Sequence, residues 1–136
     1  KPLITQYSVR EAIKQSIRLL LAEDNPVNQK LASMMLQKAG YAVDVVDNGK
    51  KAVATYHRDP HHFDLILMDV QMPEMDGLEA TRQIRLNGHQ VPIIAMTANT
   101  MKGDREKCLA AGMNDYVAKP LKRETVFKLI EKWHER

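Results

Sequence analysis

Residues 64–69, with the sequence DLILMD, are a short apolar run that ends in an acidic residue. Two other runs have a similar form, since LLLAED (19–24) ends in two acids and YVAKP (116–120) leads into a lysine. Continuous apolar runs of this length are typical of strands that are buried on both faces of a parallel sheet. The three segments are therefore predicted to be strands of one sheet.

Ligands of such sheets bind outside the carboxyl ends of the strands. The charged side chains at the ends of the three runs are therefore expected to converge; they are Glu23, Asp24, Asp69 and Lys119. Three carboxylates and one ammonium group at one place favour Mg²⁺ and a phosphoryl group as ligands, because Mg²⁺ prefers oxygen ligands and phosphate oxygens pair with lysine. This convergence is the main indication of function.

Length and composition indicate one soluble globular domain, with 136 residues of which 44% are hydrophobic and 27% charged. No apolar stretch is long enough to cross a bilayer. The single Cys108 excludes an internal disulfide and fits a reducing cytoplasm, which is the expected location. The net charge is +3, but the basic residues are scattered, so neither nucleic-acid binding nor membrane contact is expected. Because the chain starts with Lys1, we expect it to be a piece of a longer protein.

Strand and helix patterns alternate after residue 16. Strands are predicted at 17–22, 42–46, 63–69, 91–96 and 115–118. Helices are predicted from 26 to about 40, from 47 or 48 to about 58, and over 76–86, 100–111 and 121–134. Asn25 and Asn99 are the expected N-caps of the first and fourth helices, and Pro26 suits a first helical position. The first helix is expected to turn one face toward the sheet, formed by Asn28, Leu31, Ala32, Met35, Leu36 and Ala39.

Five strand–helix units with short connections predict a doubly wound α/β fold with helices on both faces of a parallel sheet. Periodicity does not give the strand order. The chain lacks a G-x-G-x-x-G motif and a Walker-type glycine loop, which argues against a dinucleotide or P-loop fold. Residues 1–15 are a polar leader, expected to be a linker from a preceding domain, so the domain itself is predicted to span 16–136.

The charged residues suggest a phosphoryl-transfer site. Asp24 and Asp69 are expected to ligate Mg²⁺, with Glu23 holding a coordinated water. Asp69 is the candidate nucleophile, since aspartyl phosphates are an established covalent device. Lys119 and Thr97 are expected to contact phosphoryl oxygens. Each residue also has a structural interpretation, as a cap, a turn residue or a surface lysine. Four complementary groups at corresponding strand ends favour the site.

Four segments of the chain, LLLAEDNPVNQK, DLILMDVQMPEMDG, PIIAMTANTMKGD and AAGMNDYVAKPL, resemble the receiver domain of two-component response regulators, especially those at the end of hybrid histidine kinases. The resemblance covers residue 16 to the C-terminus. It implies the flavodoxin-like strand order 2-1-3-4-5 and a cis Lys119–Pro120 peptide. It also implies that Mg²⁺, or Mn²⁺, is bound by Asp24, Asp69 and the backbone carbonyl of Gln71.

The resemblance further implies a switch. On phosphorylation of Asp69, Thr97 moves toward the phosphoryl group and Tyr116 turns into the vacated space. The helix over 100–111 contains Gly103 and few apolar residues, so it is expected to be weakly held. Gly103 is equally compatible with simple tolerance near a helix start.

The leading hypothesis is a phosphoacceptor module that takes a phosphoryl group from a histidine kinase core or a histidine phosphotransfer domain. By this reading the receiver catalyses only its own phosphotransfer and dephosphorylation, and a hybrid kinase is the expected parent. Val27, Leu31 and Met34 are candidate docking residues, or an ordinary packing edge. A Mg²⁺-dependent phosphatase is the alternative, but its usual second aspartate would fall at Gln71. A degenerate interaction domain is disfavoured by the intact acidic cluster.

Overall fold

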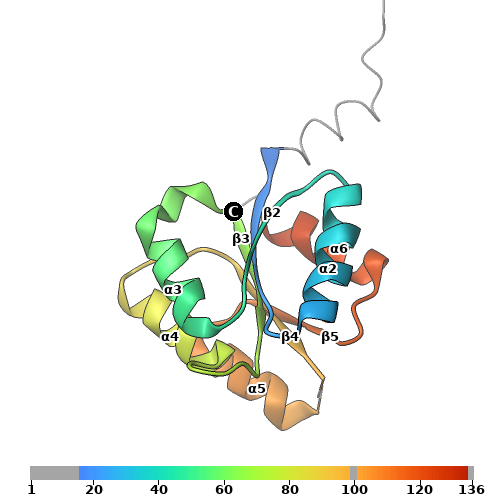
Figure 1. Ribbon diagram of the computed structural model, residues 1–136. Helices are drawn as coiled ribbons and strands as arrows, with labels where there is room; N and C mark the ends of the chain where they lie inside the picture. Colours follow the sequence, from blue (N-terminus) through green and yellow to red (C-terminus); the bar gives the residue numbers. More distant parts are fainter. Residues whose placement is uncertain (1–15, 99–100, 135–136) are drawn as a thin grey trace, which may run out of the picture.

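A five-stranded parallel sheet forms the centre of the structure, a computed structural model that describes residues 16–98 and 101–134. The strands lie in the order β2-β1-β3-β4-β5 (Figure 1). Their bounds are β1 Arg18–Ala22, β2 Ala42–Val46, β3 Leu65–Asp69, β4 Ile93–Thr97 and β5 Asp115–Ala118. The strand order implied by the family resemblance is confirmed.

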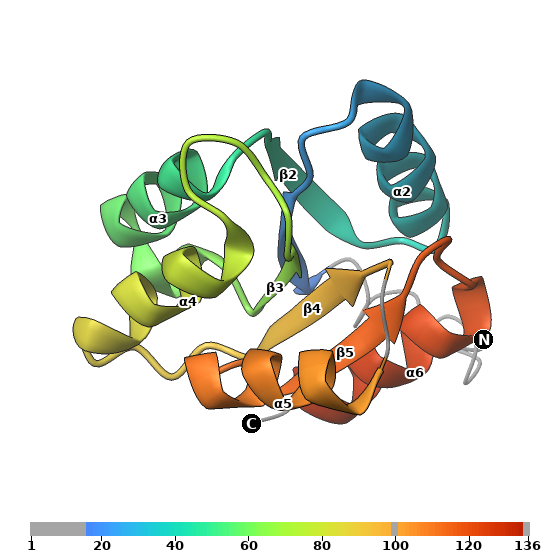
Figure 2. The same cartoon turned by 90° about the horizontal axis from the view of Figure 1, so that it is seen from below.

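Helices cover both faces of this sheet. Their bounds are α2 Pro26–Lys38, α3 Gly49–Arg58, α4 Gly77–Leu86, α5 Lys102–Ala111 and α6 Arg123–Trp133, with a 3-10 turn η1 at Pro60–His62. Helices α2 and α6 lie on one face, and α3, α4 and α5 lie on the other (Figure 2). The doubly wound architecture predicted from the alternating pattern is therefore confirmed.

The central strands are buried on both faces because their apolar runs supply side chains to two separate cores. In β3, Ile66 and Met68 pack into the core under α3, α4 and α5. Leu65 and Leu67 pack into the core under α2 and α6. All four side chains have no exposed surface. Burial of each contributes roughly 1.5–3 kcal/mol, so the run that predicts the strand also stabilises it.

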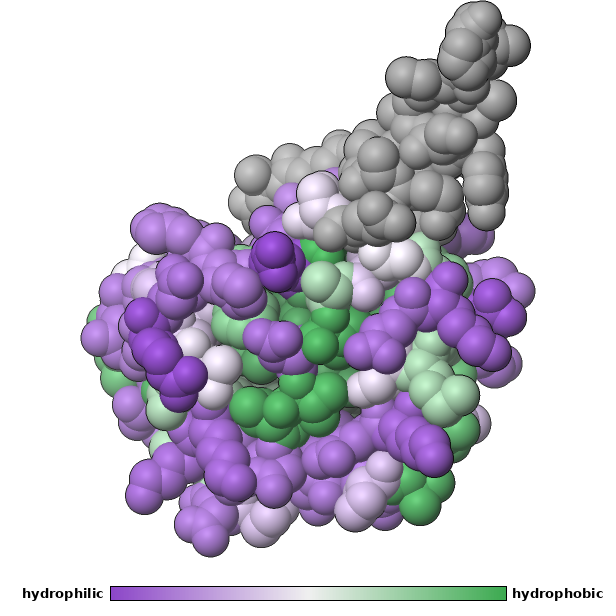
Figure 3. Space-filling view, turned by 45° about the horizontal axis from the view of Figure 1, so that its top comes forward, coloured by the Kyte–Doolittle hydropathy of each residue, from purple (hydrophilic) through white to green (hydrophobic). Residues whose placement is uncertain are grey.

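Strand β2 lies at one edge of the sheet and is less buried than the central strands. Its Val45 is 40% exposed. Figure 3 shows apolar side chains gathered in the middle of one face of the molecule, between hydrophilic flanks. None of the residues of β2 is fully buried, which fits an edge strand with only one paired neighbour.

Three predicted strand boundaries differ from the structure by one or two residues. Strand β1 starts at Arg18 rather than residue 17. Strand β3 starts at Leu65 rather than residue 63, because η1 and its C-cap Phe63 occupy the preceding residues. Strand β4 runs from Ile93 to Thr97 rather than over 91–96. Thr97 belongs to the strand because its carbonyl accepts from the Lys119 N–H at 2.9 Å.

Side-chain caps fix the starts of three helices. The Asn25 side chain accepts hydrogen bonds from the N–H groups of Val27 and Asn28, as predicted for the N-cap of α2. Asn48 caps α3 and Asp76 caps α4 in the same way. Helix α5 starts at Lys102 rather than residue 100, with Met101 at its N-cap position, and the predicted cap Asn99 lies outside the described residues. Helix α6 spans Arg123–Trp133, shorter than the predicted 121–134.

The sheet-facing side of α2 is narrower than predicted. Ala32 and Leu36 are buried, as expected. Asn28 and Leu31 were predicted to face the sheet, and this was wrong, because both are exposed. The physical reason is that Asn28 and Leu31 line a groove between α2 and the Lys119–Leu121 segment, where no strand covers them.

Arg85 joins three segments at the amino-terminal end of β4. Its guanidinium donates to the carbonyls of Gly112 and His89 and to the side-chain oxygen of Asn114, at 2.9–3.0 Å. The same Asn114 oxygen accepts from the Ile93 N–H at 2.8 Å. This network ties the end of α4 to the start of β4 and to the turn before β5.

Both ends of the described domain lie at the amino-terminal edge of the sheet. The N–H of Arg18, at the start of β1, donates to Asp64 beside the start of β3 at 2.8 Å. The indole of Trp133, at the end of α6, donates to Asp115 at the start of β5 at 2.9 Å. The carboxyl edge, where the predicted site residues lie, is the opposite edge.

Candidate functional site

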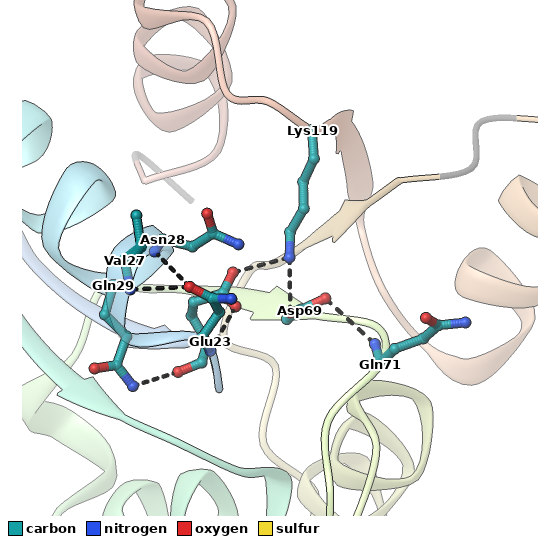
Figure 4. Close-up of polar contacts among 8 residues, drawn as sticks. Glu23, Val27, Asn28, Gln29, Asp69, Gln71 and Lys119 are labelled. Atoms are coloured by element: carbon teal, nitrogen blue, oxygen red, sulfur yellow. Dashed lines mark hydrogen bonds and ion pairs between the residues drawn. The ribbon is translucent and has the colours of Figure 1, made fainter.

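The carboxyl edge of the sheet brings together the four charged residues that end the apolar runs. Glu23 and Asp24 follow β1, Asp69 is the last residue of β3, and Lys119 follows β5. Figure 4 shows Lys119 reaching across the edge toward Glu23 and Asp69. The predicted convergence is confirmed.

Lys119 is the centre of the polar contacts. Its Nζ lies 2.7 Å from Asp69 Oδ2 and 2.9 Å from Glu23 Oε1. The lysine side chain is 22% exposed, whereas those of Glu23 and Asp69 are 3% and 7% exposed. One ammonium group therefore neutralises part of the charge of two buried carboxylates and leaves an excess of negative charge.

The acidic residues form a set that fits a divalent cation. One carboxylate oxygen from each of Glu23, Asp24 and Asp69 lies within 4.8 Å of the others. Asp24 is exposed, while the other two are buried. The three line a cavity of about 830 Å³ that also contains Thr97 and Lys119. Hard oxygen ligands beside an open space are the arrangement that Mg²⁺ accepts, since it keeps several of its waters.

Close packing of α4 constrains the backbone of Asp69, and a backbone N–H contacts its carboxylate. A Cβ added at Gly77 would collide with the backbone carbonyl oxygen of Asp69, so only glycine allows the start of α4 to lie this close to β3. The Gln71 N–H lies 3.3 Å from Asp69 Oδ1. Asp69 is 5% exposed, but it faces the cavity rather than the apolar core.

The pKa values of the two buried carboxyl groups, Asp69 and Glu23, are shifted in opposite directions. Burial raises the pKa of Asp69 to about 6, and the negative charge of Glu23 adds to this effect against the opposing bond from Lys119. Burial also acts on Glu23, but hydrogen bonds from Lys119 and the Asn25 N–H outweigh it and lower the pKa of Glu23. Burial opposes the charged form of Lys119, yet its two carboxylate partners raise the pKa of the ammonium group. Lys119 is therefore a cation throughout the physiological range.

The two residues of the expected switch lie on neighbouring strands. Thr97 is 8% exposed and lines the acidic cavity. Tyr116 is half-buried on β5, opposite Ala95 of β4, and its hydroxyl accepts a hydrogen bond from Arg105 at 2.7 Å. The structure thus places Thr97 in the site and Tyr116 beside it.

Comparison with known proteins identifies the family. The family model described as "Response regulator receiver domain" matches residues 19–131. The chain is a receiver domain. The cis Lys119–Pro120 peptide implied by the resemblance is present.

Relatives of this receiver domain are parts of much longer kinases. The chain is 45% identical to Hybrid signal transduction histidine kinase I of Dictyostelium discoideum, over 83% of this chain and 7% of that protein. It is 41% identical to the signal transduction histidine-protein kinase BarA of Escherichia coli strain K12, over 93% of this chain and 14% of that protein. The receiver domain thus spans only a small part of these relatives. In the described residues, no helix combines the length and the apolar character needed to cross a membrane.

Two solved structures resemble this receiver domain closely. The receiver domain of the sensor histidine kinase PA1611 from Pseudomonas aeruginosa is 49% identical, with a TM-score of 0.81 over 89% of this chain and 99% of that one. That structure contains a magnesium ion in the active site cleft. A co-crystal structure from Saccharomyces cerevisiae, of the histidine phosphotransfer protein Ypd1 with the receiver domain of Ssk1, matches at 34% identity and a TM-score of 0.80, over 88% and 89% of the chains.

An apolar groove adjoins the acidic cavity of the receiver domain. It has a volume of about 470 Å³ and lies between α2 and the segment after β5, where Leu31, Met35 and Leu121 line it. On the same helix, Val27, Leu31 and Met34 are 66%, 63% and 44% exposed. This groove and these three exposed side chains are together called the α2 surface below. The groove joins the charged site through the shared lining residues Glu23, Asn28 and Lys119.

Two residues near the site were missed by the sequence analysis. Gln29 Nε2 donates to the Glu23 carbonyl at 2.6 Å and so fixes the turn that carries the acid pair. Arg105 contacts Tyr116 from α5. Both side chains are polar residues on helices, and helical periodicity does not distinguish them from solvent-facing residues.

The raised pKa of Asp69 makes the stability of the metal-free domain depend on pH. The unfolded chain ionises this carboxyl near its ordinary value of 3.8, so the folded state binds more protons between pH 3.8 and about 6. Its stability therefore falls as the pH rises through that window. We expect Asp69→Asn to raise the free energy of unfolding by roughly 1–2 kcal/mol at pH 7.5 in a chelator, because the ionised carboxylate is buried beside Glu23.

Urea unfolding at pH 7.5 and pH 4, with Mg²⁺ chelated, measures this effect. The increase in the free energy of unfolding of Asp69→Asn should be present at pH 7.5. It should disappear near pH 4, where Asp69 is protonated in the native domain. Asp104→Asn, at a less buried acid on the rim of the cavity, is the matched control and should change little. An equal gain at both pH values would show that ionisation of Asp69 is not its cause.

Proposed function

We propose that this receiver domain accepts a phosphoryl group from a phosphohistidine onto Asp69, with Mg²⁺ bound at the acidic cluster. The observation that carries the proposal is the Asp69 carboxylate, held 2.7 Å from the Lys119 ammonium at the floor of an open acidic cavity. A buried structural ion pair would not need a third and a fourth group, Asp24 and Thr97, at the same opening.

The transfer step uses Asp69 as the nucleophile. One carboxylate oxygen forms a bond to phosphorus while the phosphorus–nitrogen bond of the donor breaks, and the electron pair of that bond returns to the imidazole nitrogen. With a pKa of about 6, the carboxyl is mostly ionised at neutral pH and is available to react. Lys119 stabilises the negative charge on one phosphoryl oxygen, and the Thr97 hydroxyl is placed to donate to another.

Asp24, Asp69 and the backbone carbonyl of Gln71 would hold Mg²⁺, and Glu23 would orient one of its waters. The bound cation supplies charge neutralisation, which lets an anionic phosphoryl group approach an anionic site. Mn²⁺ should substitute, because it also prefers oxygen ligands. The support for this ligand set is the acidic cluster itself and the magnesium ion in the related PA1611 receiver.

The proposed switch follows from the placement of Thr97 and Tyr116 on adjacent strands. Once Asp69 carries a phosphoryl group, Thr97 turns toward it and Tyr116 turns inward into the space that Thr97 vacates. Helix α5 is the element that responds, since only Cys108 and Ala111 of its residues are buried. Gly103 is the second residue of α5 and a Cβ there would touch nothing, which supports simple tolerance of glycine near the helix start.

We propose that the phosphoryl donor or acceptor partner is a kinase core or a histidine phosphotransfer domain, which docks on the α2 surface. Support comes from the exposed apolar residues next to the acidic cavity and from the related receiver that crystallised with Ypd1. The longer parent is proposed to be a cytoplasmic hybrid histidine kinase or the cytoplasmic part of a membrane-bound one, with residues 1–15 as the linker and 16–136 as the receiver domain.

Leu31→Glu and Met34→Glu should each weaken docking, because a carboxylate replaces apolar contact area beside an already acidic cavity. We expect the rate of transfer from a cognate phosphorylated histidine phosphotransfer domain to fall by about tenfold. Labelling by acetyl phosphate, which needs no docking, measures the intact site in the same samples. Gln37→Glu, an exposed position on the same helix, is the control. Unchanged transfer by both variants would exclude this surface.

Labelling with acetyl phosphate tests the proposed function directly. In Mg²⁺, intact mass spectrometry should show the addition of one phosphoryl group, labile as an acyl phosphate, and a chelator should prevent it. Sustained hydrolysis of phosphate esters over many turnovers would instead favour the phosphatase alternative. No labelling in Mg²⁺ would indicate a degenerate interaction domain.

A further inference from the structure

Arg105 makes two contacts with the same tyrosine. Its Nη1 donates to the Tyr116 hydroxyl at 2.7 Å. Its guanidinium carbon lies 5.4 Å from the centroid of the Tyr116 ring, within the range of a cation–π contact. Both groups are partly buried, so solvent screens these contacts less than it would on an open surface.

Within the described part of the chain, the first half of α5 contributes no fully buried side chain to the packing on the sheet. The buried residues of this helix, Cys108 and Ala111, lie in its second half. At the other end, Met101 is 70% exposed, and Leu109 within the helix is 50% exposed. The contact from Arg105 to Tyr116 therefore joins the weakly packed half of α5 to strand β5.

Tyr116 lies on the strand next to the one that carries Thr97, a residue that lines the acidic cavity. In the register of β4 and β5, Tyr116 pairs with Ala95 and Ala118 pairs with Thr97. Side chains two residues apart on a strand share a face, so Tyr116 and Thr97 lie on the same face of adjacent strands. The neighbour of the tyrosine ring on β4 is thus the small side chain of Ala95. A movement of this ring toward Thr97 would carry its hydroxyl away from the position in which Arg105 binds it.

We propose that Arg105 is a positioning residue that holds Tyr116 in its present orientation and so opposes activation of the receiver. This inference rests on the proposed function, and specifies its regulation. Arg105 is not among the residues that line the acidic cavity, and its route to the site is the contact with Tyr116. The ring is released only when the phosphoryl group stabilises the alternative arrangement by more free energy than the two contacts with Arg105 contribute to the present one.

Removal of the guanidinium should shift the equilibrium toward the activated arrangement. A hydrogen bond and a cation–π contact of this kind correspond to a shift of about three- to tenfold in the population ratio. Arg105→Ala should therefore raise the rate of labelling by acetyl phosphate by about the same factor. Arg105→Met keeps an apolar side chain of similar length and so controls for lost packing. It should raise the labelling rate as Arg105→Ala does.

Fluorine NMR of the chain labelled with 3-fluorotyrosine reports the ring directly. The Tyr116 resonance is assigned as the signal missing from Tyr116→Phe, and Mg²⁺ with beryllium fluoride defines its position in the activated state. In the free protein, Arg105→Ala should move the Tyr116 resonance toward that position. Lys102→Ala removes an exposed charge from the same helix and should move neither the resonance nor the rate. Thermal melts verify that each variant is folded.

The outcomes separate this inference from the proposed function. If the wild-type chain takes up no phosphoryl group, the proposed function is wrong, while the resonance of free Arg105→Ala still tests the contact. If the wild-type chain is labelled but both Arg105 variants keep the wild-type resonance and rate, the positioning role is wrong. The same increase in rate for Arg105→Ala in a Tyr116→Ala background would also overturn it, because the effect would then pass through neither the hydroxyl nor the ring of the tyrosine.

Discussion

Replacement of Asp69 by Asn is expected to abolish phosphoryl labelling of the domain. The amide keeps the shape of the side chain but has no anionic oxygen to attack phosphorus. It also removes one of the three carboxylates of the proposed Mg²⁺ site. We expect the labelling rate with acetyl phosphate and Mg²⁺ to fall by at least about a thousandfold, which is the scale seen when a nucleophile is removed.

Intact mass spectrometry over a time course measures this change. Asp104→Asn is the matched control, since it makes the same substitution at the rim of the same cavity and should label at close to the wild-type rate. Peptide mapping after reduction of the acyl phosphate with borohydride should place the modification at residue 69. Labelling of Asp69→Asn at the wild-type rate would assign the phosphoryl group to another residue.

Lys119→Met is expected to slow labelling by about a hundred- to a thousandfold, the scale found when a group that stabilises transition-state charge is removed. The methionine is similar in length, so it fills the space of the lysine stem without the ammonium group. Charge on the phosphoryl oxygens then lacks its protein cation, and the substrate meets an acidic site with one positive charge fewer. Lys122→Met, at an exposed lysine three residues further on, is the control.

Cation binding distinguishes a lost catalytic contact from a collapsed site in Lys119→Met. Without the ammonium group, Glu23 and Asp69 lose their nearest positive charge, so the affinity for Mg²⁺ should rise or stay constant. Isothermal titration with Mg²⁺ measures this. Slow labelling together with unchanged or tighter Mg²⁺ binding fits the proposed role of Lys119. Wild-type labelling by this variant would exclude it.

The location of the site was predictable from the sequence because it depends on strand ends. Each apolar run marks a buried strand, and parallel strands bring their carboxyl ends to one edge, so Asp69 and Lys119 were expected at the same edge of the sheet. The order of the strands was not available from periodicity, because each strand is apolar regardless of its neighbour. Only the resemblance to receiver domains supplied it.

Other features depend on packing that no local pattern encodes. Leu31 has the spacing of a core residue, yet it is 63% exposed and lines a groove. Thr97 extends β4 because the backbone of Lys119 pairs with it. Arg105 has the sequence context of a surface residue, and its contact with Tyr116 exists because two segments meet in space.

The positions of Arg18 and Trp133, close to the starts of β3 and β5, have a consequence for the design of longer proteins. A polypeptide joined before the first strand or after the last helix is attached at the end of the domain opposite the acidic opening. The domain can therefore be fused to, or inserted within, an unrelated protein while the entrance of its cavity stays accessible to a partner protein.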